Sequence, residues 1–508
     1  MKKLLAVCCF VFSMLALAAA QPNKSHKSPL ATRIDKLLDE GQSAQAHWGV
    51  LVADLKDARV VFARNEHKLF APASNTKLFT TAAALETLGP KFTFRTTVEA
   101  ATPLTEGQVA GDLVLVGRGD PNLSPRVVPY PGRSEYSASP MIAIDKLADQ
   151  LFAAGLRSVS GDIVGDDTYF LFERYPDGWT VDDTLWDYGA PVSALTVNDN
   201  ELWLTVTPGD KPGDSAQAVL EPMAGFSVEN RIRTVEKDAP HRIQINREPG
   251  SKLFELWGEI PVGGSDSHQR LAMDDPAEVA ARCLREALSA RGVAVRGGVR
   301  MRHRRAIDRD IDRDIDAPAS PFVLAAVESL PLAADLKVIN KVSQNLHAEI
   351  VLRTLGVAHH ELLGKPPGSL AAGLEARKAF LLKAGLTSEE FYFLDGSGLS
   401  RADVVAPAAT VQLLTYMDAS PNREIWLDTL PIAGTDGSLP SRLQTSCTLG
   451  KILAKTGTYR HTAALSGYMT TSHGHRLVFS IMVNNHNMPA RDATRVMDNV
   501  LDEICRAQ

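Results

Sequence analysis

The sequence of 508 residues has little cysteine and no excess of positive charge. Of its 5 cysteines, Cys8 and Cys9 lie close to the start, and the formal net charge is −6. The remaining three, Cys283, Cys447 and Cys505, cannot all pair within one chain, so we expect at most one disulfide bond and no disulfide framework. The acidic balance argues against a nucleic-acid-binding protein, because such a protein needs a basic surface.

Long apolar runs are also scarce, and the longest one stands at the start of the chain. Two lysines precede the uncharged stretch Leu4–Leu17, and Ala18-Ala19-Ala20 is typical of a cleavage site. We therefore predict a signal peptide over 1–20 and an exported, periplasmic protein. An uncleaved membrane anchor is the alternative, although a spanning helix needs about 20 apolar residues. No later run approaches that length, so we expect no integral membrane span after cleavage.

Several common site patterns are missing. No H-E-x-x-H follows His359-His360-Glu361, and Gly117-x-Gly119 does not open an apolar helix. There is also no G-x-S-x-G motif, which argues against an α/β-hydrolase. We expect neither a metal nor a cofactor.

The middle of the chain differs in texture from its two ends. Trp48–Asp54 and Val60–Ala63 alternate as a β-hairpin would, and Ile452–Asn485 is typical of three strands. Between them, from about Lys91 to Arg300, short strand-like runs are separated by Gly, Pro and Asp turns. The pattern predicts that both ends share one sheet and that the middle is a separate β-rich insertion.

Helical patterns lie on both sides of this insertion and within it. The charged stretch at 306–318, "AIDRDIDRDIDAP", is either a linker or a charged edge strand. The C-terminal segment is amphipathic, and we expect it to be buried against the protein. The predicted helices are Ala31–Glu40, Ala138–Ala154, Pro276–Arg291, Phe322–Asn340, Gln344–Leu355, Ser369–Ala384 and Asp492–Gln508.

A first short motif is Ser74-x-x-Lys77, at the start of a mostly apolar run. Residues three apart share a helix face, so the lysine amine lies within reach of the serine hydroxyl. Such a lysine can act as the base for a serine nucleophile if burial or nearby positive charge lowers its pKa. Alone, the motif is a weak signal, and a serine N-cap followed by an exposed lysine is the simpler interpretation.

A second motif is Ser343-Gln344-Asn345, also at a predicted helix start. Its serine and amide can project into one cleft, where the serine relays a proton to a leaving amine and the asparagine bonds a substrate amide. The alternative is another helix cap.

A third motif is Lys455-Thr456-Gly457-Thr458, within a strand-like run. The lysine and hydroxyl can bind a carboxylate, and Gly457 removes a side chain where substrate lies against the strand. The N–H groups of Thr458 and Ser74 can together form an oxyanion hole. A surface strand and turn is the alternative.

The three motifs follow the order S-x-x-K, S-x-N and K-T-G, which is the set found in penicillin-binding proteins and β-lactamases, here with Gln344 in place of the usual aspartate. The sequence thereby resembles the class C low-mass penicillin-binding proteins, the D-alanyl-D-alanine carboxypeptidase/endopeptidase family. The long gap between Ser74 and Ser343 is typical of that family, as are the stretches Gly111–Ser124, Asp395–Arg401 and Ala433–Leu439.

The resemblance implies a role for each motif residue. Ser74 would be the acylated nucleophile, Lys77 its base, and Ser343 the donor of a proton to the leaving D-alanine. Asn345 would hold the peptide, and Lys455 and Thr456 would bind its terminal carboxylate.

The resemblance further implies an acidic residue in the first insert that recognises the amine of the stem peptide's side chain. Asp183 is the candidate, with a solvated loop aspartate as the alternative. Arg401 is a second candidate for substrate contact, with a structural ion pair as the alternative. The implied partners are peptidoglycan stem peptides and, as inhibitors, β-lactam antibiotics; whether the chain forms a homo-oligomer is left open.

The implied fold class is α+β, with a penicillin-recognising serine transpeptidase/β-lactamase-like domain that has an antiparallel sheet between helices and an all-helical subregion. Two small β-rich domains would split it. The expected division is 30–92 with 318–508 for the catalytic domain, 93–195 with 290–317 for the first insert, and 196–289 for the second.

The implied activity is that of a serine DD-peptidase, acting on D-Ala-D-Ala ends and on D-Ala-diamino acid cross-links. A β-lactamase or esterase of the same fold is one alternative, although such relatives commonly carry a tyrosine where this chain has Ser343. A catalytically silent peptidoglycan-binding scaffold is another.

Overall fold

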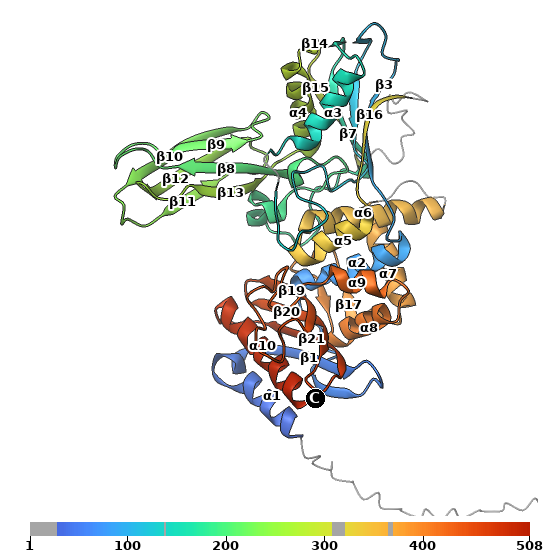
Figure 1. Ribbon diagram of the computed structural model, residues 1–508, viewed down its shortest axis with the longest axis vertical. Coiled ribbons are helices and arrows are strands. Elements are labelled where there is room, and N and C mark those ends of the chain that lie inside the picture. Colours follow the sequence, from blue (N-terminus) through green and yellow to red (C-terminus); the bar gives the residue numbers. More distant parts are fainter. Residues whose placement is uncertain (1–27, 137–138, 307–320, 364–368) are drawn as a thin grey trace, which may run out of the picture.

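The computed structural model describes residues 28–136, 139–306, 321–363 and 369–508 (Figure 1). The predicted signal peptide and all but the first residue of the charged stretch at 306–318 lie outside these ranges. Within them, no helix is both long enough and apolar enough to span a membrane.

The two ends of the chain form one five-stranded antiparallel sheet, as the sequence predicted. Its order is β19-β20-β21-β1-β2, so the C-terminal strand β21 pairs directly with the N-terminal strand β1. The strands are β1 (His47–Asp54), β2 (Val60–Arg64), β19 (Ile452–Tyr459), β20 (Thr462–Thr470) and β21 (Arg476–Asn484). Strand β19, which carries the third motif, lies at one edge of this sheet.

Helices cover both faces of the sheet (Figure 1). On one face, α1 (Pro29–Asp39) packs on α10 (Ala490–Ala507), whose apolar side is buried as predicted. A disulfide joins Cys447 to Cys505 of α10, and Cys283 is a free, buried thiol. On the other face, α2 (Thr76–Thr87) and α8 (Pro407–Asp418) share a core with the sheet and with the remaining helices. Those are α5 (Leu332–Val342), α6 (Asn345–Leu362), α7 (Leu370–Lys383) and α9 (Arg423–Thr429), beside a short pair of strands, β17 (Phe391–Tyr392) and β18 (Val404–Val405).

The inserted middle contains a second five-stranded sheet, of order β15-β7-β5-β3-β16. Helices α3 (Ile142–Ala153) and α4 (Pro276–Ala290) pack against it. Its strands are β3 (Arg95–Ala100), β5 (Leu113–Val116), β7 (Ile163–Leu171), β15 (Val299–Arg304) and β16 (Phe322–Glu328), and a small neighbouring sheet holds β4 (Gln108–Val109), β6 (Ser158–Val159) and β14 (Ala294–Val295).

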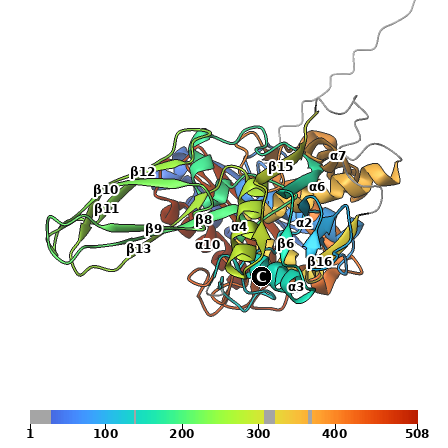
Figure 2. The same cartoon turned by 90° about the horizontal axis from the view of Figure 1, so that it is seen from above.

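Two three-stranded sheets extend sideways as an arm, most clearly seen from above (Figure 2). Alternating residues of their strands, such as Leu202, Leu204, Ile232 and Phe254, are buried in one shared core. The strands are β8 (Glu201–Thr207), β9 (Gln217–Glu221), β10 (Ser227–Val235), β11 (Arg242–Asn246), β12 (Leu253–Pro261) and β13 (Ser267–Ala272).

One predicted helix is wrong over its first half. Phe322–Glu328 is strand β16, which pairs with β3 of the inserted sheet, and the helix begins only at Leu332. An apolar run rich in strand-forming residues lies between Pro321 and Pro331. Its length is typical of a strand. The division of the chain into domains stays a prediction, but this pairing assigns β16 to the inserted sheet.

Candidate active site

The predicted nucleophile Ser74 lies in a short 3-10 turn, η2 (Ala73–Asn75), directly before α2. The turn is tight, since Ala73 has a φ of +47°, in a region that L-residues rarely adopt. Gly398 packs directly against it: a Cβ at this glycine would lie 1.9 Å from the carbonyl oxygen of Ala73. The backbone around Ser74 is therefore held in place by a glycine far away in the sequence.

Lys77 points back at Ser74 from the first turn of α2. Its Nζ lies 2.9 Å from Ser74 Oγ, 2.6 Å from Asn345 Oδ1 and 2.7 Å from the carbonyl oxygen of Ser397. The side chain is fully buried. This burial lowers the pKa of Lys77 to about 7, although the charges of Asp395, Glu349 and Asp403 oppose the shift. A substantial fraction of the amine is therefore neutral near neutral pH and can accept the serine proton.

The second motif converges on the same point. Ser343 caps α5 in a left-handed conformation, with a φ of +68°, and Asn345 begins α6. Asn345 accepts a hydrogen bond from Lys77 and donates one to the carbonyl oxygen of Tyr188, in the insertion, at 2.7 Å. The insertion thus contacts the second motif directly.

The third motif lies along β19, beside Ser74. Lys455 Nζ donates to Ser343 Oγ at 2.9 Å and to the carbonyl oxygen of Thr456 at 2.8 Å. Burial, and then repulsion from Lys77, hold the pKa of Lys455 well below its usual value. A Cβ at Gly457 would lie 2.5 Å from the carbonyl oxygen of Pro72 and 3.0 Å from Ser74 N, so only glycine allows the strand to approach the nucleophile this closely.

Buried carboxylates behind Lys77 are functional residues that motif reasoning missed. Glu349 of α6 accepts hydrogen bonds from the N–H groups of Gly396 and Ser397, at 2.8 and 2.9 Å. It thereby fixes the carbonyl oxygen of Ser397, which binds the Lys77 amine. Its spacing from Asn345, four residues along one helix face, is the signal that could have indicated it.

The structure pairs the two substrate-contact candidates with each other. Arg401 donates to both carboxylate oxygens of Asp183, at 2.7 and 3.1 Å, and Asp183 also accepts from the N–H and the hydroxyl of Thr180. Asp183 is buried, whereas its neighbour Asp182 is exposed. Both line the cavity that contains Ser74. The sequence contained both aspartates side by side, with nothing to tell which one a local turn would bury.

These elements enclose a cavity of about 660 Å³ around the nucleophile, which we call the catalytic cavity. Its lining includes Ser74, Ser343 and Asn345. Thr458 and Tyr459 of β19, the following Arg460, and the 180–188 loop of the insertion also line it.

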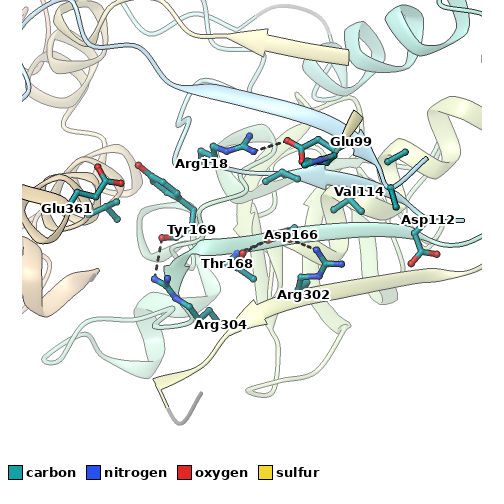
Figure 3. Close-up of a pocket in the computed structure, with 15 residues that line it drawn as sticks. Glu99, Asp112, Val114, Arg118, Asp166, Thr168, Tyr169, Arg302, Arg304 and Glu361 are labelled. Carbon is teal, nitrogen blue, oxygen red and sulfur yellow. Dashed lines mark hydrogen bonds and ion pairs between the residues drawn. The ribbon is translucent and has the colours of Figure 1, made fainter. Parts of the chain in front are cut away.

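Another cavity, of about 450 Å³, lies on the face of the inserted sheet and shares no lining residue with the catalytic one. Figure 3 shows that its charged groups face one another: Arg118 bonds Glu99 and Arg302 bonds Asp166. Among the described residues, two of its arginines thus already have acidic partners, and we assign this cavity no catalytic role.

Residues 30–504 match the D-Ala-D-Ala carboxypeptidase 3 (S13) family. The chain belongs to this family. It is 33% identical over 486 residues to a D-alanyl-D-alanine carboxypeptidase from an Actinomadura species, across 93% of this chain and 84% of that protein. A D-alanyl-D-alanine carboxypeptidase from Haemophilus influenzae is 23% identical, across 86% of this chain and 85% of that one. This S13-family chain is accordingly a serine-type D-Ala-D-Ala carboxypeptidase, as the sequence predicted.

The fold of this carboxypeptidase matches a solved relative. The crystal structure of penicillin binding protein 4 from Haemophilus influenzae superposes with a TM-score of 0.78 at 22% identity, covering 93% of this chain and 99% of that one. The predicted penicillin-recognising fold, with its large insertion, is thereby confirmed.

Proposed function

We propose that this carboxypeptidase acts through an acyl-enzyme on Ser74, with Lys77 as its general base. The observation that supports this most strongly is the 2.9 Å contact between Lys77 Nζ and Ser74 Oγ, combined with a lysine pKa of about 7. A serine hydroxyl is a weak nucleophile until a neighbouring base accepts its proton, and a general base works best when its pKa lies near the working pH.

In the first step, Ser74 Oγ attacks the carbonyl carbon of the penultimate D-alanine while its proton passes to neutral Lys77. The N–H groups of Ser74 and Thr458 would stabilise the oxyanion that forms, a contribution that the close approach of Gly457 to Ser74 N supports. The C–N bond then breaks, and Ser343 passes a proton to the departing amine of D-alanine. Lys455, 2.9 Å from Ser343 Oγ, relays to Ser343 the proton that Lys77 took from Ser74, so that Lys77 is neutral again before the second step.

In the second step, water attacks the ester carbonyl and gives its proton to the base. The bond to Ser74 Oγ breaks, Ser74 recovers its proton, and the shortened peptide leaves with a new carboxylate. The net reaction consumes one water and releases one D-alanine. The three hydrogen bonds that hold Lys77 in place mean that this machinery needs no large rearrangement between the steps.

Lys455 and Thr456 would bind the terminal carboxylate of the substrate. Lys455 lacks a carboxylate partner among the described residues, and both burial and Lys77 disfavour its charge. An arriving carboxylate would supply the missing partner and favour the protonated amine. Ser438, whose hydroxyl lies 2.6 Å from that of Thr456, would complete this carboxylate site.

For the amine of the stem peptide's side chain, we propose Asp182 in place of Asp183. Asp183 already binds Arg401 and Thr180, whereas Asp182 is exposed at the wall of the catalytic cavity. Arg401 and Asp183 would then shape this wall as an ion pair.

We further propose endopeptidase activity on cross-links, acylation by β-lactams and a periplasmic location. A relative's crystal structure in complex with a β-lactam supports the second of these. The Cys447–Cys505 disulfide supports the third, since such bonds persist mainly in oxidising compartments.

The test is release of D-alanine from a disaccharide-pentapeptide by the wild type and by Ser74→Ala, with Ser227→Ala, an exposed serine on β10, as the matched control. We expect Ser74→Ala to lose at least about 10³-fold in kcat, as removal of a catalytic nucleophile does. Wild-type activity in Ser74→Ala would contradict the proposal.

A further inference from the structure

A large cavity borders the carboxylate site at Ser438 and shares no lining residue with the catalytic cavity. Its volume is about 710 Å³, and it lies between the inserted loop 130–135 and the catalytic segments 341–342 and 435–440. We call it the leaving-group cavity, for the reason that follows.

The two cavities are linked to β19 through different residues, two positions apart on the strand. The catalytic cavity is lined by Thr458, Tyr459 and Arg460. The leaving-group cavity is lined by Ser438, whose hydroxyl bonds Thr456, and by Lys341 and Val342, which directly precede Ser343. Ser74 lines the catalytic cavity and lies beside Gly457, the residue between Thr456 and Thr458.

The chemistry gives this arrangement a direction, and this step rests on the proposed function. The acyl group sits at the N–H groups of Ser74 and Thr458, whereas the departing residue carries the carboxylate bound by Lys455 and Thr456. The acyl-donating peptide therefore extends from the Thr458 end into the catalytic cavity. Whatever is attached to the leaving amine extends past Ser438.

We propose that the leaving-group cavity binds the second stem peptide of a cross-linked substrate. A terminal D-alanine ends at the carboxylate site and has nothing to place beyond it. In a cross-link, the leaving amine belongs to a diamino acid whose own peptide continues. A cavity of about 710 Å³ falls within the range of about 300–1,000 Å³ that holds a ligand much larger than one alanine.

The cavity is built as a defined surface. Lys341 and Asp436, both largely buried, form an ion pair at its base. Tyr130 of the insertion ties the two walls together: its hydroxyl accepts a hydrogen bond from the N–H of Gly437 at 3.1 Å and donates one to the carbonyl oxygen of Gly132 at 2.7 Å. The inserted loop is thus held against the catalytic part.

The rim supplies the charge that recognises the peptide. Arg133 has an 82% exposed side chain, and among the described residues its one acidic partner is Glu135, bonded through Nε. The terminal guanidinium nitrogens remain to bind a carboxylate, the group that stem peptides present repeatedly. The predicted ligand is therefore an anionic peptide.

The experiment compares two substrates with the full chain. One is a disaccharide-pentapeptide, which ends in D-Ala-D-Ala; the other is a purified cross-linked dimer of tetrapeptides, in which only the cross-link can be cut. The variants are Arg133→Glu and Thr435→Trp. Arg133→Glu reverses the charge on the inserted wall of the leaving-group cavity, and Thr435→Trp fills space at the opposite wall. Arg231→Glu is the control, because Arg231 also pairs with an acidic residue two positions away, on the exposed face of β10.

We expect Arg133→Glu to lower kcat/KM for the dimer by about fivefold or more, with the pentapeptide and the control within about twofold of wild type. Thr435→Trp should act in the same way. Undiminished dimer cleavage by both variants, or equal losses on both substrates, would overturn the proposal.

The wild type alone separates this inference from the proposed function. Cleavage of the pentapeptide without any cleavage of the dimer overturns the inference and leaves the carboxypeptidase mechanism standing. A wild type inert toward both substrates and toward penicillin overturns the proposed function itself.

Discussion

At the scale of single residues, the burial of Lys77 decides what the site can do. An ordinary lysine stays protonated at neutral pH and cannot accept a proton from serine. Burial between α2, α6 and the Asp395–Ser397 segment lowers its pKa to about 7 and makes it a base. The neighbouring carboxylates limit this shift, so the site balances two opposing effects.

The first prediction concerns pH. Because the proposed base is the neutral form of Lys77, acylation should slow as pH falls below about 7, by about tenfold per pH unit. Rates of acylation by a chromogenic β-lactam, measured at about nine pH values half a unit apart from pH 5 to 9, would show this limb. Lys77→Arg should be inactive at every pH, because a guanidinium does not lose its proton in proteins. The assignment of Lys77 as the base would be contradicted if Lys77→Arg were active and its acylation rate fell over the same acidic pH range as that of the wild type.

The second prediction separates the two neighbouring aspartates. Asp182→Asn should raise KM for a substrate with a free side-chain amine by about fivefold, since an exposed charge pair contributes up to about 1 kcal/mol. A substrate whose amine is acetylated should not respond. Asp183→Asn should instead lower the melting temperature, because it leaves Arg401 without its partner. The reverse pattern would return the role to Asp183.

At the scale of elements, the site depends on contacts between segments far apart in the sequence. Gly398 illustrates this, since it allows the 395–401 loop to lie against the turn that carries Ser74. We expect Gly398→Ala to abolish acylation, because the new Cβ would meet the carbonyl oxygen of Ala73 at 1.9 Å. Gly474→Ala is the matched control: it also has a positive φ, but open space surrounds it. Intact acylation by Gly398→Ala would show that the loop can move aside.

A buried network joins the insertion to α6. His347, two residues after Asn345, bonds Asp335 of α5 at 2.7 Å and Asp199 of the insertion at 3.4 Å. Burial disfavours its charge, but these carboxylates outweigh the burial and raise the pKa of His347 to about 9. Arg126 bonds Asp199 as well, and Ser134 at the rim of the leaving-group cavity.

The network makes stability depend on pH. Because its folded pKa lies above the unfolded value of about 6.5, His347 stabilises the fold fully below pH 6.5 and loses this contribution as pH rises through about 9. At the acidic end the contribution is roughly 3 kcal/mol. The melting-temperature difference between wild type and His347→Gln should therefore shrink from pH 6 to about 10. His475→Gln, at a half-exposed histidine, is the control. A difference that grows with pH would contradict the network.

The elements predicted from the sequence were largely those with strong local periodicity. The hairpin at the start, the three strands at the end, α4 and α10 all lie where the pattern put them. Strand β16 was missed because its apolar run fits a helix as well as a strand, and only its pairing with β3 decides between them. For the site, the motifs located the chemistry. The spacing of Glu349 from Asn345 gave a local signal, whereas the positions of Gly398 and Asp182 depend on contacts that no local pattern contains.

At the scale of the whole molecule, the C-terminal helix α10 packs against one face of the five-stranded sheet that contains β19, and one disulfide bond links it to Cys447. Cys447 and Cys505 are 58 residues apart, and cross-linking a loop of this kind contributes about 2–4 kcal/mol. Cys447→Ser should lower the melting temperature to about that of the reduced wild type, whereas Cys283→Ser should keep its response to reductant. Calorimetry with and without dithiothreitol measures both. No shift on reduction would mean that the bond adds nothing to stability.

The insertion contacts the catalytic part of the molecule at several points. It does not merely extend from the catalytic part, because Tyr188 contacts Asn345, Asp183 holds Arg401, and Tyr130 contacts Gly437. Two inserted loops, 130–135 and 180–188, thus reach the walls of the two cavities. This arrangement supports the hypothesis that the insertion helps to select the substrate.

The most direct test of the account is intact-mass spectrometry after brief exposure to benzylpenicillin. The account predicts that the wild type gains the mass of one penicillin, that Ser74→Ala gains none, and that peptide mapping places the adduct on Ser74. An adduct of the same yield on Ser74→Ala, or an adduct mapped to another residue of the wild type, would contradict it.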